Sequence, residues 1–220
     1  MKVSRRGIML TAALTTIALA VSGCSAQFEP ESVAPAESVE NIYVSVPRGS
    51  TENLVLGKLY QLALRSSGRT TIVQLVDEDP ESRFRALDEG QADLTIGCAG
   101  ELLEHFNPSR AAELEREYLA EGTIDPNSGE WREEVYDALV ASLPGHLAAT
   151  DPSNAVACEG SNALPQNIVP IYRKPALNRE ERSILNVVGG TINTADLQML
   201  MGEYREGAGV VAGYLAGKGL

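Results

Sequence analysis

A turn between a buried strand and a new helix, within residues 86–103, constrains the fold of this chain most strongly. The stretch reads ALDEGQADLTIGCAGELL: a helix ends near Asp88, Gly90 makes a tight turn, and an apolar strand at 92–97 leads into a helix that opens near Ala99–Glu101. This arrangement puts backbone N–H groups at the carboxyl edge of a sheet, where open α/β sheets bind their ligands. The stretch therefore predicts an α/β fold with a binding site at that edge.

Two further strands precede this turn, and a helix follows each of them. The expected strands span 41–46 and 71–76, and the expected helices span 52–66 and 79–88. Ser50 or Thr51 caps the first helix and Gly68 ends it, while Asp79 or Ser82 begins the second. Alternation of strands and helices indicates a doubly wound, mostly parallel sheet with crossover connections.

The remainder of the chain is mainly helical in pattern. Strands are expected at 155–158 and 164–174, and a turn-rich insertion at 122–129. The expected helices span 101–106, 109–120, 131–143, 179–187, 195–203 and 207–216.

Composition limits the domain count and the class of partner. A length of 220 residues suits one domain or two small ones, and 44% hydrophobic residues suffice for a core. The formal net charge is −12, which argues against nucleic acid as a partner and against electrostatic docking on anionic lipid. Solubility alone explains such a charge.

The first residues predict export and a lipid anchor. Lys2, Arg5 and Arg6 precede an apolar run that is too short to cross a bilayer comfortably. The run ends in Val-Ser-Gly-Cys24, which resembles a bacterial lipobox; an ordinary secretory signal or an uncleaved anchor are the alternatives. We expect a lipoprotein signal peptide at 1–23, lipidation of Cys24, and a disordered tether at 24–40, rich in Ser, Ala, Pro and Glu.

Cys98 and Cys158 remain in the mature chain. An even number of cysteines in an oxidising compartment favours a disulfide between them, and two buried thiols are the alternative. We expect no metal site, because His105 and His146 lack ligand spacing to a cysteine. Neither histidine belongs to a catalytic constellation and no G-x-S-x-G is present, so the chain is not expected to be an enzyme.

The stretch 86–103 resembles the substrate-binding proteins of glycine betaine, carnitine and choline (osmoprotectant) ABC importers, whose turn typically reads DLYPEYTGT. Three residues match this pattern: Asp93, Leu94 and Gly100. Thr95 and Cys98 stand where that family has tyrosines, and Glu101 stands where it has a threonine.

The resemblance extends over most of residues 41–220. Ser50-Thr51-Glu52-Asn53 is similar to the family's F-T-E-Q, and 164–174 is similar to its return strand, P-P-x-N-x-x-P-x-x-R. The family places a second lobe before this return strand, and here only 159–163 stand in its place. The resemblance implies a single lobe of a type II periplasmic-binding-protein-like fold.

The resemblance implies a ligand site at the strand ends. The expected ligand-binding residues are Ser50, Thr51, Asn53, Thr95, Cys98, Gly100, Glu101, Gln166 and Asn167. That family encloses a quaternary ammonium in aromatic rings, but none of the seven tyrosines here matches a cage position. For each polar residue named, helix capping or turn chemistry is the competing interpretation.

Two functions follow as hypotheses. The first is an extracytoplasmic, lipid-anchored solute-binding protein that delivers a small polar or quaternary-amine solute to an ABC permease, without a cofactor. The second is a one-lobe surface lipoprotein that serves as a scaffold for protein contacts and binds no solute. A homodimer across the exposed cleft is compatible with either hypothesis.

Overall fold

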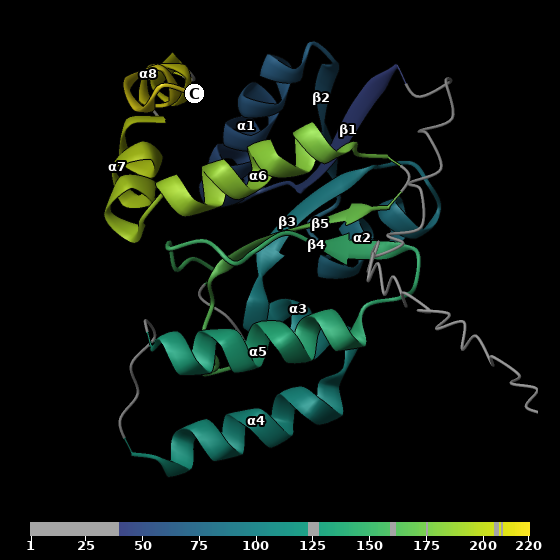
Figure 1. Ribbon diagram of the computed structural model, residues 1–220, viewed down its shortest axis with the longest axis vertical. Helices are drawn as coiled ribbons and strands as arrows, with labels where there is room; N and C mark the ends of the chain where they lie inside the picture. The colour runs from purple at the N-terminus through teal and green to yellow at the C-terminus, as the bar shows by residue number, and fades with distance from the viewer. Residues whose placement is uncertain (1–39, 123–127, 159–161, 175, 205–206, 208) are drawn as a thin grey trace, which may run out of the picture. The chain divides into compact units, whose positions relative to one another are not determined.

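The computed structural model describes residues 40–122, 128–158, 162–174, 176–204, 207 and 209–220. The expected signal peptide, the lipidation of Cys24 and nearly all of the expected tether lie outside these residues. The described part forms one five-stranded sheet with strand order β2-β1-β3-β5-β4 (Figure 1). Its strands are β1 (Asn41–Pro47), β2 (Thr70–Val76), β3 (Leu94–Cys98), β4 (Leu147–Ala149) and β5 (Ile168–Arg173).

One half of the sheet is parallel and doubly wound. β1 pairs in parallel with β2 on one side and with β3 on the other. The connecting helices, α1 (Thr51–Leu64) and α2 (Pro80–Asp88), pack into different hydrophobic clusters on the two faces of the sheet. This confirms the predicted α/β fold class. The strand order reverses at β1, so a topological switch point lies at the carboxyl ends of β1 and β3.

The other half of the sheet is antiparallel. β5, the expected return strand, pairs antiparallel with β3 and with the short β4, which the sequence patterns did not predict. The prediction of a strand at 155–158 is wrong. This segment forms isolated bridges, such as that of Val156 with Asn167, instead of a strand. Cys158 adopts a φ of +50°, and Ser153 Oγ donates to the carbonyl of Ala155, so the backbone bends away from a regular ladder.

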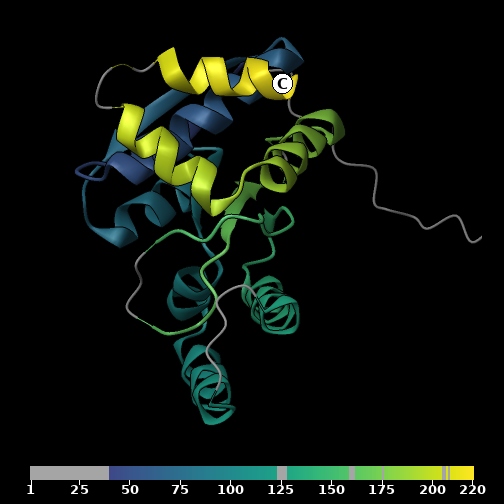
Figure 2. The ribbon, with the colours of Figure 1, turned by 90° about the vertical axis from the view of Figure 1, so that its left-hand side faces the viewer.

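Four helices cover the first face of the sheet. α6 (Arg179–Thr191), α7 (Thr194–Tyr204) and α8 (Gly209–Lys218) all contact α1 (Figure 2). They pack on alternate residues of β1, namely Ile42, Val44 and Val46, which are buried. The period of two in a strand and the apolar stripe of α1 explain why these side chains meet.

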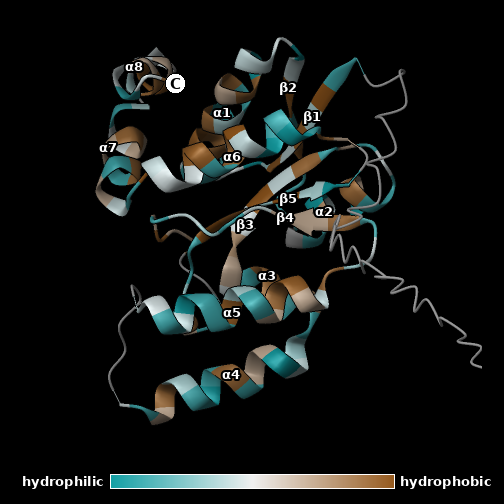
Figure 3. Cartoon of the chain, in the orientation of Figure 1, coloured by the Kyte–Doolittle hydropathy of each residue, from teal (hydrophilic) through white to brown (hydrophobic). Residues whose placement is uncertain are grey.

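The opposite face carries α2 and three further helices. These are α3 (Ala99–Phe106), α4 (Pro108–Ala120) and α5 (Gly129–Ser142), and α3 contacts both α4 and α5. Val169 and Ile171 of β5 point into this second cluster, whereas Ile168 and Tyr172 belong to the first. Hydrophobic and hydrophilic residues alternate around α4 and α5, as Figure 3 shows, so each helix has a buried and a solvated side.

Local capping signals locate the starts of α1 and α2 and the end of the turn after α1, whereas the helix expected at 179–187 continues to Thr191 in α6. Ser50 is the N-cap of α1, and its Oγ accepts the Asn53 N–H at 3.2 Å. Asp79 is the N-cap of α2. Gly68, with a φ of +84°, ends the short 3₁₀ turn η1 (Arg65–Ser67) that follows α1. Within the described ranges, no helix has the length and apolarity required to cross a membrane.

Candidate functional site

A cleft of about 860 Å³ opens at the topological switch point. Its walls come from the end of β1, the first turn of α1, the start of α2 and the exposed side of α3. The side chains that matter for its chemistry are Ser50, Glu52, Asn53, Glu78, Glu81, Arg83, Phe84, Glu101, Glu104, His105 and Cys158. Open α/β sheets bind ligands at this position, so the cleft is the candidate site.

Three of the expected ligand-binding residues line this cleft: Ser50, Asn53 and Glu101. Ser50 also caps α1, so both interpretations of its hydroxyl coexist. Thr51 begins α1 but is not among the lining residues. Thr95 is fully buried in the sheet, where its Oγ1 donates to the Ser45 carbonyl at 3.1 Å.

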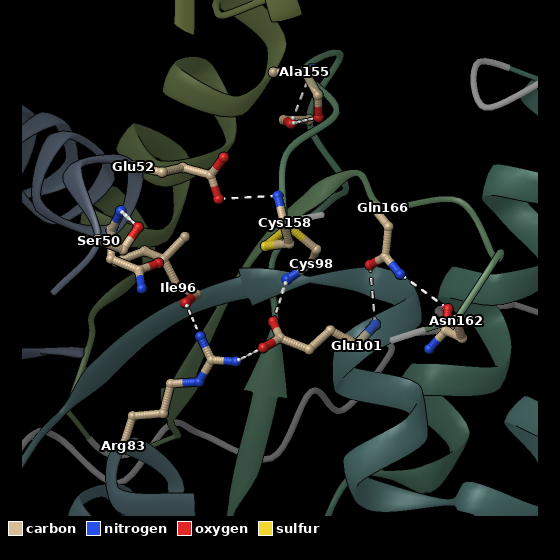
Figure 4. Close-up of a disulfide and its surroundings, with 12 residues drawn as sticks. Ser50, Glu52, Arg83, Ile96, Cys98, Glu101, Ala155, Cys158, Asn162 and Gln166 are labelled. Atoms are coloured by element: carbon tan, nitrogen blue, oxygen red, sulfur yellow. Dashed lines mark hydrogen bonds and ion pairs between the residues drawn. A yellow bond between two sulfur atoms is a disulfide. The ribbon is translucent and has the colours of Figure 1, made fainter. Parts of the chain in front are cut away.

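The backbone N–H groups in the first turn of α3, which were expected to bind a ligand, donate hydrogen bonds to acceptors of the same chain. Ala99 N–H donates to the Asn167 carbonyl at 2.9 Å, and Gly100 N–H donates to the Pro165 carbonyl at 3.1 Å. Glu101 N–H donates to Gln166 Oε1 at 3.0 Å (Figure 4). The segment before β5 therefore occupies the N-terminus of α3 in place of a ligand.

The other expected site residues hold this segment in place. A Cβ on Gly100 would lie 2.7 Å from Gln166 Nε2, so glycine permits the close approach of the chain rather than that of a solute. Gln166 Nε2 also donates to Asn162 Oδ1 at 2.9 Å. Asn167 Nδ2 donates to the Ser153 carbonyl at 3.0 Å. Gly100, Gln166 and Asn167 are thus structural and do not line the cleft.

The predicted disulfide between Cys98 and Cys158 is present, with a Cα–Cα distance of 6.1 Å. Cys98 is fully buried, whereas Cys158 lines the cleft. The Cys158 N–H donates to Glu52 Oε1 at 2.9 Å, which ties the bridge to the first turn of α1 (Figure 4). The disulfide therefore borders the cleft through Cys158.

An ion pair between the buried Arg83 and the partly exposed Glu101 lines the cleft. Arg83 on α2 is buried; its Nη1 donates to the Ile96 carbonyl at 3.0 Å, and its Nη2 contacts Glu101 Oε1 (Figure 4). The guanidinium carbon also lies 4.8 Å from the centre of the Phe84 ring. A buried arginine requires such partners, because a bare buried charge is costly.

The cleft is acidic. Five carboxylates line it, from Glu52, Glu78, Glu81, Glu101 and Glu104, against the guanidinium of Arg83 and the imidazole of His105. His105 stacks on Phe84 with ring centres 3.9 Å apart, and its Nδ1 lies 3.0 Å from Glu81 Oε1. A negative lining with low-dielectric walls concentrates cations.

Of the five lining carboxylates only Glu101 was expected in the site, although the sequence carried a signal for others. Glu52, Glu81 and Glu101 each lie in the first turn of a helix, where a carboxylate is stabilised by the helix dipole. Helices that follow parallel strands all begin at the carboxyl edge of the sheet, so their first turns converge there. Arg83 carried no comparable signal, because its partners are distant in sequence.

Metal binding has no support in the described residues, which contain no group of three or more His, Cys, Asp or Glu side chains suitable for an ion. Among the described residues that line the cleft there is no tyrosine. A site built on carboxylates, with one nearly buried phenylalanine ring, can hold a cation by charge rather than by an aromatic cage.

Comparison with known proteins shows a shared fold. No family model matches the chain, and no curated protein matches it. The solved structure of apo YehZ from Escherichia coli aligns with a TM-score of 0.60 and 14% identity, over 81% of this chain and 99% of that chain. At this identity the likeness shows the fold alone.

Two other solved structures align with lower scores. A TRAP periplasmic solute-binding protein from Pseudomonas putida F1 with bound D-glucuronate has a TM-score of 0.45 and 9% identity, over 81% of this chain and 85% of that chain. A second, from Ochrobactrum anthropi, has a TM-score of 0.40 and 13% identity, over 81% of each chain.

Proposed function

We propose that this chain is an extracytoplasmic solute-binding protein that takes a small cationic solute in the cleft at the switch point. The observation that carries the proposal is the acidic lining of that cleft, in which five carboxylates face two basic side chains. A quaternary ammonium offers charge without N–H donors, and carboxylates satisfy that charge without requiring a hydrogen bond. The solute class is therefore a quaternary or protonated amine.

The resemblance to osmoprotectant importers supports the same class of solute and an ABC permease as the receiving partner. A lipidated Cys24 would keep the protein at the membrane surface close to that permease, with residues 25–40 as the tether. A lobe without a covering partner leaves part of a bound solute in water, which lowers the affinity that enclosure provides. We expect weak binding, stronger at low ionic strength because the attraction is electrostatic.

A ligand panel on the full chain, purified in mild detergent, tests this function. Choline, which is a cation, and carnitine and glycine betaine, which carry the same trimethylammonium group together with a carboxylate, are compared with acetate in thermal melts and calorimetry. A cationic solute at 100 times its dissociation constant should stabilise the fold by about 2.7 kcal/mol, while acetate should have no effect. The replacement Glu104→Gln should weaken binding of the cation, because it removes one lining carboxylate.

The scaffold function is the second candidate, and one observation favours it. The N-terminus of α3, the expected ligand position, is closed by residues 165–167 and by the disulfide next to it. A flat ligand panel from a protein that melts cooperatively would contradict the solute-binding proposal and support the scaffold.

A further inference from the structure

The two members of the Arg83–Glu101 ion pair differ in how much of each side chain is exposed to the cleft. Arg83 lines the cleft, yet only 3% of its side chain is exposed, compared with 28% for Glu101. The carboxylate is therefore the member of the pair that meets solvent. Within the described residues, Arg83 Nε has no hydrogen-bond partner. Arg83 is thus a buried guanidinium that meets the cleft through its contact with Glu101, and its Nε is an unpartnered donor enclosed by the described residues.

A guanidinium in this position is a carboxylate receptor. Arginine presents its donors in a planar fork that matches the two oxygens of a carboxylate. Here the carboxylate already in contact belongs to the protein itself, in Glu101. A solute with its own carboxylate would have to displace Glu101, which would leave two carboxylates competing for one guanidinium.

Glu101 is held where it can resist displacement. Its backbone N–H is fixed by Gln166 Oε1 at 3.0 Å, and its position as the third residue of α3 sets the direction of its side chain. Because the carboxylate is covalently part of the site, it competes as an intramolecular ligand at high effective concentration.

We propose that Glu101 determines the charge type of the solute: by occupying Arg83, it selects a cation without a carboxylate and rejects zwitterions and anions of similar size. This inference rests on the proposed function and deepens it. It assigns Glu101 to specificity, as distinct from the general attraction that all the lining carboxylates exert on a cation.

Choline and glycine betaine are matched probes for this proposal. Both carry a trimethylammonium group, and they differ in that choline ends in a hydroxymethyl group where glycine betaine ends in a carboxylate. The full chain should bind choline more tightly than glycine betaine by about tenfold or more, since a like charge next to Glu101 is strongly unfavourable. Calorimetry at low ionic strength measures both constants.

Two variants test the residue. Glu101→Gln removes the competing charge, so the choline preference should fall to near one or reverse, through gained affinity for glycine betaine. Glu101→Asp keeps the charge and should keep the preference. Glu117→Gln, which removes an exposed carboxylate on α4 outside the cleft, controls for net charge and should leave the ratio unchanged. Melting curves of each variant check that the fold is retained.

The outcomes separate this inference from the proposed function. If the parent chain binds neither probe, the solute-binding proposal fails and this inference falls with it. If the parent binds glycine betaine as tightly as choline, or if a folded Glu101→Gln variant keeps the parental ratio, the role of Glu101 is refuted while solute binding stands. The comparison of the two probes on the parent chain requires no variant to fold.

Discussion

At the scale of single residues, tyrosine hydroxyls illustrate how burial and hydrogen bonding differ in energy. Tyr60 on α1 is fully buried, and its hydroxyl has no hydrogen-bond partner within the described residues. Tyr214 on α8 is half-buried and donates to Asp196 Oδ2 at 3.0 Å. Burial raises the pKa of Tyr60; for Tyr214, burial and then the hydrogen bond with Asp196 raise the pKa. The buried hydroxyl of Tyr60 therefore destabilises the fold, whereas the hydrogen bond to Asp196 compensates the burial of the Tyr214 hydroxyl.

We predict that Tyr60→Phe stabilises the protein by about 1 kcal/mol, because it removes a buried hydroxyl without a partner. Tyr214→Phe should instead destabilise it by about 1 kcal/mol, since it breaks the bond to Asp196. Urea unfolding of both variants measures the difference. A loss of stability in Tyr60→Phe would show that the hydroxyl has a partner, such as a buried water.

Tyr60 also makes the stability of the protein depend on pH, and the sign of this dependence follows from its raised pKa. The raised pKa means that the folded state holds the phenolic proton more tightly than the unfolded state. The contribution of the protonated Tyr60 to the free energy of unfolding is fully present below the pKa of the unfolded state, about 10. It is lost as the pH rises through the pKa of the folded state. The parent should therefore lose stability above about pH 10 more steeply than Tyr60→Phe.

At the scale of elements, the start of α6 is joined to the rest of the fold by one buried carboxylate, in addition to the core packing of Leu185 and Val188. Glu181 is fully buried: its Oε1 accepts from Arg69 Nη1 at 2.9 Å, and its Oε2 accepts from the Asn178 backbone N–H at 2.8 Å. Asn178 Oδ1 in return accepts the Glu181 N–H, which completes a capping box. The helix start and its docking thus depend on the same side chain.

We predict that Glu181→Gln lowers the free energy of unfolding by about 3 kcal/mol, because Arg69 loses a charged partner and the new amide presents a donor to other donors. Glu113→Gln serves as the control. Its pair with Arg110 is exposed on α4, so the expected change is within about 0.5 kcal/mol. Equal melting curves for the two variants would contradict this assignment.

At the scale of the whole described part, the disulfide connects segments that are distant in sequence. Cys98 and Cys158 are 60 positions apart, and the loop between them contains α3, α4, α5 and β4. Closing a loop of this length removes much conformational freedom from the unfolded chain, by roughly 4 kcal/mol of chain entropy at 25 °C. The bridge also reinforces the edge where the cleft opens.

We predict that the double variant Cys98→Ala/Cys158→Ala unfolds with roughly 4 kcal/mol less free energy than the oxidised parent. A reductant should lower the melting temperature of the parent towards that of the variant, and should leave the variant unchanged. Peptide mapping without reduction provides the independent check. Recovery of both cysteines as free thiols would contradict the bridge.

Most of the element order could be predicted because the signals are local. The capping residue Ser50, the turn at Gly90 and the periodicity of 41–46 and 92–97 involve neighbours within a few positions. The misassigned strand at 155–158 and the missed β4 are short segments. Their structure depends on pairing with distant residues, Asn167 for Val156 and β5 for β4, rather than on their own residues.

The candidate site was predictable only in part. Ser50, Asn53 and Glu101 line the cleft, because they follow strand ends that the sequence had already located. Gly100, Gln166 and Asn167 were expected to contact a solute, yet they hold the segment before β5 on the start of α3. No local pattern distinguishes an N–H that meets a ligand from one that meets a distant part of the same chain.

Local patterns in the sequence were enough for the α/β class, for most of the order of the helices and strands, and for the pairing of Cys98 with Cys158, because these follow from periodicity, capping and the parity of cysteines. The tertiary structure alone decided the antiparallel direction of β5, the closure of α3 and the meeting of Arg83 with Glu101. These depend on contacts between residues 18 to 78 positions apart, and such contacts form only when the sheet brings distant strand ends to one edge.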